Sequence, residues 1–266
     1  MLPRRRWPEM TTRDFAESDT AGWIAVLPVA AIEQHGPHLP VFTDTCIAEG
    51  MIARAIELLP EELPVTFLPV QAIGKSNEHI SSPGTLTASW ETTTKLWLDI
   101  GDSVHRAGIE KLILINSHGG NVPMVDIVAR ELRVRHEMLV VGTAWSRLGH
   151  PDGLPTGEES LYGIHGGEIE TSMMLHLRPD LVRMDKAKDF RSTQLDFIGA
   201  FRHLRAHGPV QFGWKAQDLN PEGTVGNAAL ATAEKGRAVV DHQAAAFVDL
   251  CRDVAGFDTG RLWTPT

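Results

Sequence analysis

The sequence Trp23-Ile-Ala-Val-Leu-Pro-Val-Ala30 leads after two residues into Glu33-Gln-His-Gly-Pro-His-Leu-Pro40, and Asp44 follows shortly afterwards. An uninterrupted apolar run of this kind is typical of a strand buried on both faces of a parallel sheet. Residues two apart on an extended chain point the same way, so Glu33 and His35 can meet one metal ion. Asp44 can return to that ion or bridge to a second. A polar turn after a strand explains this segment equally well when it is taken alone.

The rest of the chain alternates strand-like and helix-like segments. Strands are predicted at residues 23–30, 65–70, 112–115 and 138–145, and helices at 44–59, 87–107, 122–136, 167–177 and 228–254. Asp44 and Asn121 stand where helix N-caps are expected. Repeated strand, crossover helix and strand predict an α/β fold with a parallel sheet covered by helices on both faces. No repeat or linker divides the chain, so residues 1–266 are expected to form a single domain.

Composition excludes several classes of partner. The chain has 266 residues, with 42% hydrophobic and 22% charged residues, which suits a globular protein. The net charge of −9 argues against nucleic acid, for which a basic surface is expected. The most apolar run, residues 23–32, is far shorter than the ~20 residues that cross a bilayer, and no apolar signal core follows Arg4–Arg6. Cys46 and Cys251 are interpreted as reduced thiols, so a cytoplasmic location is expected.

Polar clusters follow each predicted strand. In parallel sheets, ligands bind outside the carboxyl ends of the strands, so these clusters are expected to lie along one edge. They are the segment after Ala30, the loop Ser76–His79, the turn Asn116-Ser-His-Gly-Gly-Asn121 and the segment His165-Gly-Gly-Glu-Ile-Glu-Thr-Ser172. His118 on its glycine-rich turn suits a metal, although such a turn can equally cradle an anion at a helix N-terminus.

The last cluster carries two acidic residues, Glu168 and Glu170, at the start of a predicted helix. They diverge by about 200° around the helix axis, so they cannot face one ion as equals. One of them can ligate while the other holds an outer hydrogen bond or caps the helix. Both also suit the first turn of a helix, where the helix dipole favours negative charge.

Several of these segments, in this order, resemble the creatininase (creatinine amidohydrolase) family. The resemblance rests on the segment from Glu33 to Asp44, Glu78-His79, Ser82-Pro-Gly-Thr85, the His118 turn, the His165 segment and Gly226-Asn-Ala-Ala-Leu-Ala-Thr-Ala-Glu-Lys-Gly236. It implies a three-layer α/β sandwich with a mostly parallel central sheet, assembled as a homohexamer. It also implies two divalent ions per chain, zinc or manganese with iron as a further option. Glu33, His35, Asp44 and His118 match the family's metal ligands, with Asp44 in the bridging role.

The sequence departs from the creatinine hydrolases after His118. The motif of those enzymes looks like Asn-Gly-His followed by an aromatic residue and a metal-binding Glu. This sequence has Gly119 and Gly120 at the last two positions. Members that look like formylaminopyrimidine deformylases and mycofactocin peptidases have Gly-Gly after this histidine. In the segment that corresponds to His165 onward, their motif looks like His-Ala-Gly-Glu. On that pattern Glu168 is predicted to supply the missing ligand. Leu161-Tyr162 replaces the tryptophan-bearing stretch, so creatinine itself is not expected as the substrate.

The resemblance and the residues together predict a metal-dependent amidohydrolase. A metal-bridging hydroxide would attack the carbonyl carbon of a small amide, cyclic amide or formamide. His165 is predicted to carry the proton to the departing nitrogen, or else to be a helix-start histidine bonded to backbone. The residues predicted to face the substrate are Ser76, His79, Gly119 and Gly120. The alternatives are a lactone or carbocycle hydrolase on the same site, or a non-catalytic metal- or ligand-binding protein.

Overall fold

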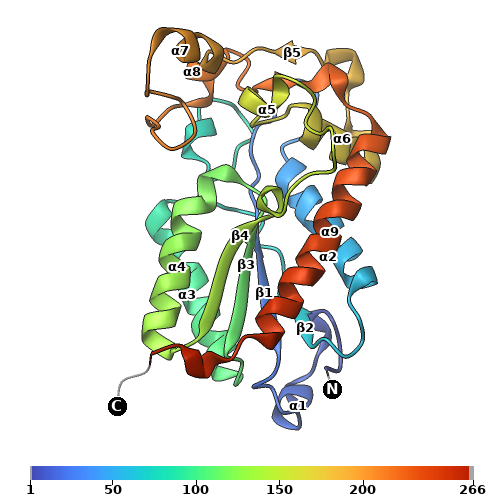
Figure 1. Cartoon of the computed structure of the whole chain (residues 1–266), viewed down its shortest axis with the longest axis vertical. Coiled ribbons are helices and arrows are strands. Elements are labelled where there is room, and N and C mark those ends of the chain that lie inside the picture. The colour runs from blue at the N-terminus through green and yellow to red at the C-terminus, as the bar shows by residue number, and fades with distance from the viewer. Residues whose placement is uncertain (1, 264–266) are drawn as a thin grey trace.

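A four-stranded parallel sheet lies at the centre of the computed structural model, which describes residues 2–263 (Figure 1). Its strands are β1 (Ile24–Val29), β2 (Val65–Phe67), β3 (Lys111–Asn116) and β4 (Leu139–Ala144), in the order β2-β1-β3-β4. All neighbouring strands run parallel. Two short strands, β5 (Asp189–Phe190) and β6 (Gly226–Asn227), form a separate antiparallel pair. The predicted strands are thus confirmed, with ends that differ by a few residues.

Helices cover both faces of the sheet. They are α1 (Thr12–Ala16), α2 (Thr43–Leu58), α3 (Trp90–Arg106), α4 (Val122–His136), α5 (Glu159–Tyr162), α6 (Glu168–Leu177), α7 (Gln194–Ala200), α8 (Ala216–Leu219) and α9 (Ala233–Gly256). Helices α3 and α4 cover one face, while α2 and α9 cover the other together with α6 (Figure 1). The three-layer α/β prediction is therefore confirmed. Within residues 2–263, no helix combines the length and apolar character that crossing a bilayer requires.

The side chains of β1 alternate between two hydrophobic cores. Ile24 and Val26 belong to the core under α2 and α9, whereas Ala25 and Leu27 belong to the core under α3 and α4. Every residue of β1 is buried, which explains why its sequence is apolar throughout rather than alternating. The strand is consequently fixed on both sides, and the polar segment that follows it begins from a rigid point.

Short 3₁₀ segments connect the main elements. Two of them, η2 (Asn77–His79) and η3 (Gly119–Asn121), follow β2 and β3 at the carboxyl edge of the sheet. The others are η1 (Trp7–Glu9), η4 (Trp145–Leu148), η5 (Pro179–Leu181), η6 (Met184–Lys186), η7 (Ala228–Leu230) and η8 (Thr259–Arg261).

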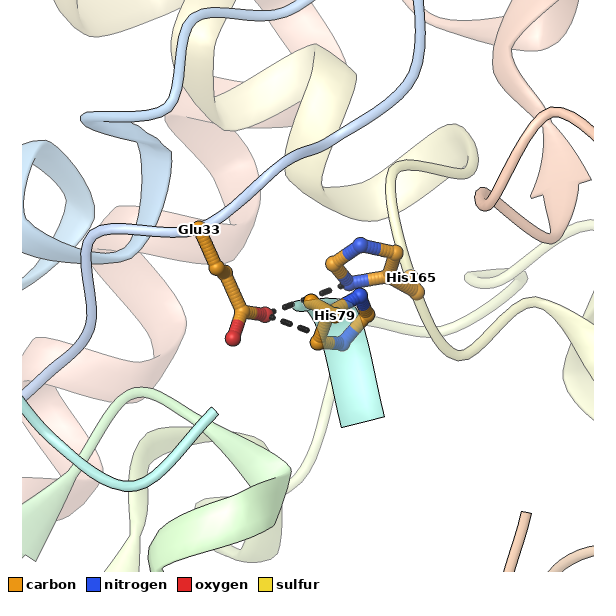
Figure 2. Close-up of side chains that lie close together, drawn as sticks. All are labelled: Glu33, His79 and His165. Atoms are coloured by element: carbon orange, nitrogen blue, oxygen red, sulfur yellow. Dashed lines mark ion pairs between the residues drawn. The ribbon is translucent and has the colours of Figure 1, made fainter. Parts of the chain in front are cut away.

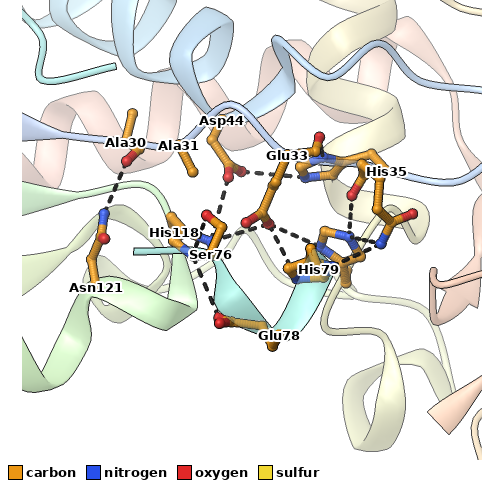
Figure 3. A network of polar contacts seen from close by, with 12 residues as sticks. Ala30, Ala31, Glu33, His35, Asp44, Ser76, Glu78, His79, His118 and Asn121 are labelled. Atoms are coloured by element: carbon orange, nitrogen blue, oxygen red, sulfur yellow. Dashed lines mark hydrogen bonds and ion pairs between the residues drawn. The ribbon is translucent and has the colours of Figure 1, made fainter. Parts of the chain in front are cut away.

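Neither predicted N-cap acts as one. Helix α2 begins at Thr43 after Phe42, so Asp44 lies inside the first turn, where its side chain is buried. Asn121 occupies the N-cap position of α4 but makes no side-chain capping bond. Its side chain instead accepts a hydrogen bond from the Lys75 N–H at 3.0 Å. It also donates one to the Ala30 carbonyl at 3.0 Å, which Figure 3 shows. Both side chains therefore serve the edge of the sheet rather than a helix end.

At the opposite end of the sheet, Lys111 braces the C-terminus of α9. Its Nζ donates to the carbonyls of Val254, Ala255 and Phe257 at 2.8, 2.9 and 3.0 Å. The Val254 carbonyl also accepts a hydrogen bond from the Phe257 N–H at 3.4 Å, and a cation at this helix end interacts favourably with the helix dipole.

Replacing Lys111 with Met is expected to lower the free energy of unfolding by about 2 kcal/mol, the usual range for hydrogen bonds to a charged group. Urea denaturation of the purified protein measures the change. Lys95→Met, on the exposed face of α3, is the matched control and should leave stability within about 0.5 kcal/mol of the unsubstituted protein. Equal stability of both variants would contradict this account of the brace.

Candidate metal centre

A cluster of carboxylates and imidazoles lies at the carboxyl edge of the sheet (Figure 3). Glu33 and His35 follow β1, Asp44 comes from the first turn of α2, and His118 comes directly after β3. Segments far apart in sequence meet here because parallel strands end at the same edge. The predicted convergence of these side chains at one rim of the sheet is therefore what the structure shows.

Glu33 lies at the centre of the cluster. Its Oε1 is 3.1 Å from His118 Nδ1, 3.4 Å from His79 Nε2 and 3.6 Å from His165 Nδ1. Figure 2 shows the last two imidazoles converging on the same carboxylate oxygen. The rings of His79 and His165 lie 4.3 Å apart, so three imidazoles crowd around one acid.

Asp44 connects two of the imidazoles. Its Oδ1 lies 3.4 Å from His35 Nε2, while its Oδ2 lies 3.5 Å from His118 Nδ1. The two oxygens of one carboxylate therefore face different rings. This is the arrangement that a carboxylate bridging two cations requires.

Glu170 faces the cluster, whereas Glu168, the predicted fifth ligand, points away from it. Glu170 Oε2 lies 3.7 Å from His35 Nε2, and the ligand atoms of His35, His165 and Glu170 all lie within 4.8 Å of one another. Glu168 is held elsewhere: its oxygens accept hydrogen bonds from the backbone and hydroxyl of Thr156, both at 2.6 Å, and from Lys235 Nζ at 2.5 Å.

The position at which α6 begins explains why Glu170, and not Glu168, faces the cluster. The helix begins at Glu168, so the two acids diverge around its axis as predicted, but it is Glu170 that faces the cluster. Glu170 also accepts a hydrogen bond from the Gly166 N–H at 2.6 Å, which fixes its carboxylate against the preceding turn.

The donor set fits divalent cations. Among the described residues, both oxygens of Glu33, Oδ2 of Asp44 and Nε2 of His35 are buried without any hydrogen-bond partner. Burying ionised carboxylates without partners is costly unless they are paired or coordinate a metal. Mixed carboxylate and imidazole ligands suit zinc and manganese. The cluster can therefore bind metal ions.

The hydrogen bonds of the rings also fit. His35 Nδ1 lies 3.0 Å from the Glu33 carbonyl, and His118 Nε2 lies 3.0 Å from the Lys75 carbonyl. A carbonyl only accepts, so each of these nitrogens carries a proton and the other nitrogen is left bare in the neutral ring. Each bare nitrogen faces the carboxylates. Metal-binding histidines typically have their second nitrogen anchored in this way.

Electrostatics make protons and metal ions competitors for this site. Burial lowers the pKa of His35, but Asp44, Glu170 and Glu33 outweigh it and raise the pKa to about 10. Against the same effect of burial, Glu33, Asp44 and Glu78 raise the pKa of His118 to about 9. Burial raises the pKa of Glu170 to about 7. Without a cation the cluster therefore retains protons on its ligands, which a bound metal would displace.

His165 has the opposite character. Burial, together with the neighbouring His35 and His79, lowers the pKa of His165 well below its ordinary value. Its Nε2 lies 2.7 Å from the Gln34 carbonyl, and its backbone pairs with that of Val225 in both directions. The ring is thus anchored to backbone, as expected for the alternative of a helix-start histidine. Its Nδ1 still faces Glu33.

The residues predicted to face the substrate differ in their surroundings. Ser76 and His79 are buried, and the Ser76 hydroxyl lies 3.3 Å from His118 Nε2. Gly119 borders open space, whereas a Cβ at Gly120 would collide with Glu78 and His118. The loop around Gly120 therefore leaves no room for a side chain at that position. That these four residues touch the substrate stays a prediction.

Two residues with no predicted role border the cluster. Glu78 Oε1 lies 3.6 Å from His118 Nε2, and its Oε2 pairs with Lys75 Nζ at 2.6 Å. Gln34 contacts both His79 and His165 through its amide nitrogen. Both residues lie in segments that carry the family resemblance, and each is adjacent to a predicted site residue.

This fold and donor set define an α/β metalloprotein, and comparison with known proteins identifies its family. A model described as "Creatininase: Creatinine amidohydrolase" matches residues 8–251. The chain belongs to the creatininase family. Relatives in this family include an amidohydrolase and a peptide peptidase, which act on C–N bonds, and this chain is a metal-dependent hydrolase.

Three relatives illustrate its range. The chain is 32% identical to the mycofactocin precursor peptide peptidase of Mycobacterium ulcerans over 82% of this chain and 80% of that protein. It is 28% identical to the creatinine amidohydrolase of Pseudomonas putida over 92% and 95% of the two chains. It is 26% identical to the 3-dehydro-scyllo-inosose hydrolase of Thermotoga maritima over 95% and 85%.

Solved structures agree with the fold. A crystal structure of creatinine amidohydrolase superposes with a TM-score of 0.75 at 25% identity, covering 96% of this chain and 100% of that one. Solved creatininases include a Zn-Zn form and an Mn form, with TM-scores of 0.73 and 0.72. These metals agree with the predicted zinc or manganese.

Substitution of the two acids of α6 tests the ligand assignment. Glu170→Gln is expected to weaken metal affinity by at least about 10–100-fold, since even outer-shell partners contribute that much. Glu168→Gln is the matched control and should retain the metal affinity while lowering thermal stability, because Lys235 loses its buried partner. Metal titration against a chromogenic chelator measures both. Loss of affinity in Glu168→Gln alone would contradict the assignment.

The pH dependence of stability tests the protonated state of the metal-free cluster. The pKa values of His35 and His118 rise from about 6.5 in the unfolded chain to about 10 and about 9 in the folded chain. Their stabilising contribution is therefore complete below pH 6.5 and is lost as the pH rises through 9 and 10.

Thermal unfolding in chelator from pH 7 to 10 measures this loss. The unsubstituted protein should unfold at a higher temperature than His35→Gln/His118→Gln near pH 7, and the difference should narrow toward pH 10. Both proteins contain the buried thiols of Cys46 and Cys251, so the titration of these thiols cancels in the difference between the two unfolding temperatures. A difference that stays constant across this range would contradict the expected protonation.

Proposed function

We propose that this chain is a dinuclear metal hydrolase that cleaves the C–N bond of a small amide, cyclic amide or formamide. The observation that carries the proposal is the burial of Glu33 and Asp44, three of whose oxygens have no partner among the described residues, between the imidazoles of His35 and His118, each of which turns one ring nitrogen toward them. Neutral protein groups do not compensate such carboxylates, whereas a pair of divalent cations does.

The proposed ligands divide around Asp44. Glu33, His118 and one Asp44 oxygen would hold one cation, while His35, Glu170 and the other Asp44 oxygen would hold the second. When bound, such a pair of cations supplies a water that ionises near neutral pH and polarises the carbonyl under attack. Four positive charges against three carboxylates leave a net positive site, which favours that ionisation.

His165 is the proposed proton carrier. Its Nε2 is committed to the Gln34 carbonyl, so only Nδ1 can exchange a proton, and this atom lies 3.6 Å from Glu33 Oε1. Burial lowers its pKa, so the ring is neutral near pH 7 and Nδ1 offers a lone pair to which a proton can be transferred. It can then return that proton to the leaving nitrogen, as a general base that becomes a general acid.

The substrate belongs to the amide class. Relatives named as a peptide peptidase and as an amidohydrolase both support a C–N bond. The relative named as a 3-dehydro-scyllo-inosose hydrolase favours, as second candidate, a carbocycle or lactone substrate on the same site. A non-catalytic role is disfavoured because every proposed ligand is present and faces the cluster.

A substrate panel tests the proposal. The metal-loaded protein is incubated with formamides, cyclic amides, short peptides, lactones and creatinine, and product amines and acids are measured. Metal-dependent release of amine from at least one amide, with creatinine untouched, is expected. Hydrolysis confined to lactones or ring ketones would contradict the proposal and favour a carbocycle or lactone hydrolase. No hydrolysis of any compound by the fully metal-loaded protein would favour the non-catalytic role.

His165→Asn is expected to lower kcat by about 10²–10⁴, the usual contribution of a general acid or base, while metal content and KM stay close to those of the unsubstituted enzyme. Steady-state kinetics on the substrate found in the panel and elemental analysis measure these quantities. His176→Asn, on α6 away from the cluster, is the matched control. Loss of metal together with activity would instead make His165 a ligand.

Assembly as a homohexamer and a cytoplasmic location stay predictions. Light scattering on the purified protein measures the first directly.

A further inference from the structure

We propose that Gln34 is a positioning residue that gives the two imidazoles beside Glu33 opposite roles. His79 presents a protonated nitrogen to the cluster, and His165 presents a bare one. The inference rests on the proposed function in one respect, because it supplies the bare Nδ1 through which His165 is proposed to carry a proton.

The orientation of the Gln34 amide is fixed by backbone groups. Its Oε1 accepts a hydrogen bond from the Gly36 N–H at 3.0 Å, and its Nε2 donates to the Gly223 carbonyl. The reversed amide would place oxygen against oxygen and N–H against N–H. Gly223 also approaches closely, since a Cβ at that position would lie 2.9 Å from Gln34 Oε1.

The fixed amide determines which nitrogen of His79 carries the proton. Gln34 Nε2 lies 2.8 Å from His79 Nδ1, and an amide nitrogen can only donate. Nδ1 must therefore accept, so the neutral ring carries its proton on Nε2. That nitrogen lies 3.4 Å from Glu33 Oε1. His79 consequently turns a donor toward the carboxylate.

The backbone of the same residue determines the state of His165. The Gln34 carbonyl lies 2.7 Å from His165 Nε2 and can only accept, so Nε2 carries the proton. The amide nitrogen, 3.1 Å from the same Nε2, is then a neighbour and not a partner. Nδ1 remains bare toward Glu33.

This difference in protonation prevents His79 from competing with the proposed ligands for a metal ion. Glu33, His79 and His165 lie close enough together to form a cation site of their own. A ring nitrogen that carries a proton cannot bind a metal, so the Gln34 amide withholds His79 from coordination. His79 is left with its protonated Nε2 facing Glu33 Oε1 at 3.4 Å, beside the ligands rather than among them.

Nitrogen NMR of the metal-free protein with ¹⁵N-labelled histidine tests the inference, since protonated and bare imidazole nitrogens resonate far apart. His79→Gln and His165→Asn assign the signals. In the unsubstituted protein, Nδ1 of both rings should be bare. In Gln34→Glu, an accepting oxygen replaces the donor, so His79 Nδ1 should become protonated while the His165 signals stay unchanged.

Gln34→Met provides a second test if Gln34→Glu does not fold. Without the donor, the His79 signals should shift toward the average of a freely exchanging imidazole, and metal affinity should fall by about 10–100-fold. Gln71→Glu and Gln71→Met, on a residue bonded to the Pro69 carbonyl at the surface, are matched controls.

A protonated His79 Nδ1 in the unsubstituted protein, or unchanged His79 signals in both Gln34 variants, would overturn the inference. These readouts need neither metal nor substrate. Correct protonation in a protein that hydrolyses nothing would therefore contradict only the proposed function, and hydrolysis with the wrong protonation would contradict only this inference.

Discussion

The carboxyl edge of the central sheet encloses two buried carboxylates that need positive charge beside them. Glu33 and Asp44 are almost fully enclosed at the end of the central strand, and three of their four oxygens have no partner among the described residues. Such groups are tolerated only when positive charge neutralises them. In the metal-free chain that charge comes from the imidazoles of His35 and His118, and the same geometry suits divalent cations.

The sheet supplies the rigidity that this arrangement needs. β1 is buried on both faces, so Glu33 and His35 start from a fixed backbone. Asn121 joins the end of β1 to the loop after β2, which holds Lys75, whose carbonyl in turn orients His118. The segments that carry Glu33, His35 and His118 are thus connected by hydrogen bonds between side chains and backbone, which limits the entropy lost when a metal binds.

Much of this arrangement was predictable from the sequence because it depends on strand order. A parallel sheet brings residues after β1 and β3 to one edge, so Asp44 and His118, far apart in the chain, lie 3.5 Å apart as expected. The choice between Glu168 and Glu170 was not predictable, because it depends on where α6 begins and on Lys235, which comes from a distant helix. The role of Gln34 depends on contacts with Gly223 and two imidazoles that no local pattern reveals.

Anomalous diffraction from crystals of the zinc- or manganese-loaded protein shows whether cations neutralise Glu33 and Asp44. A pair of peaks about 3.5–4 Å apart is expected, one on either side of Asp44, with Glu33 and His118 at one peak and His35 and Glu170 at the other. Fully loaded crystals with no peak at Asp44, or with metal bound at Glu168 instead, would contradict this expectation.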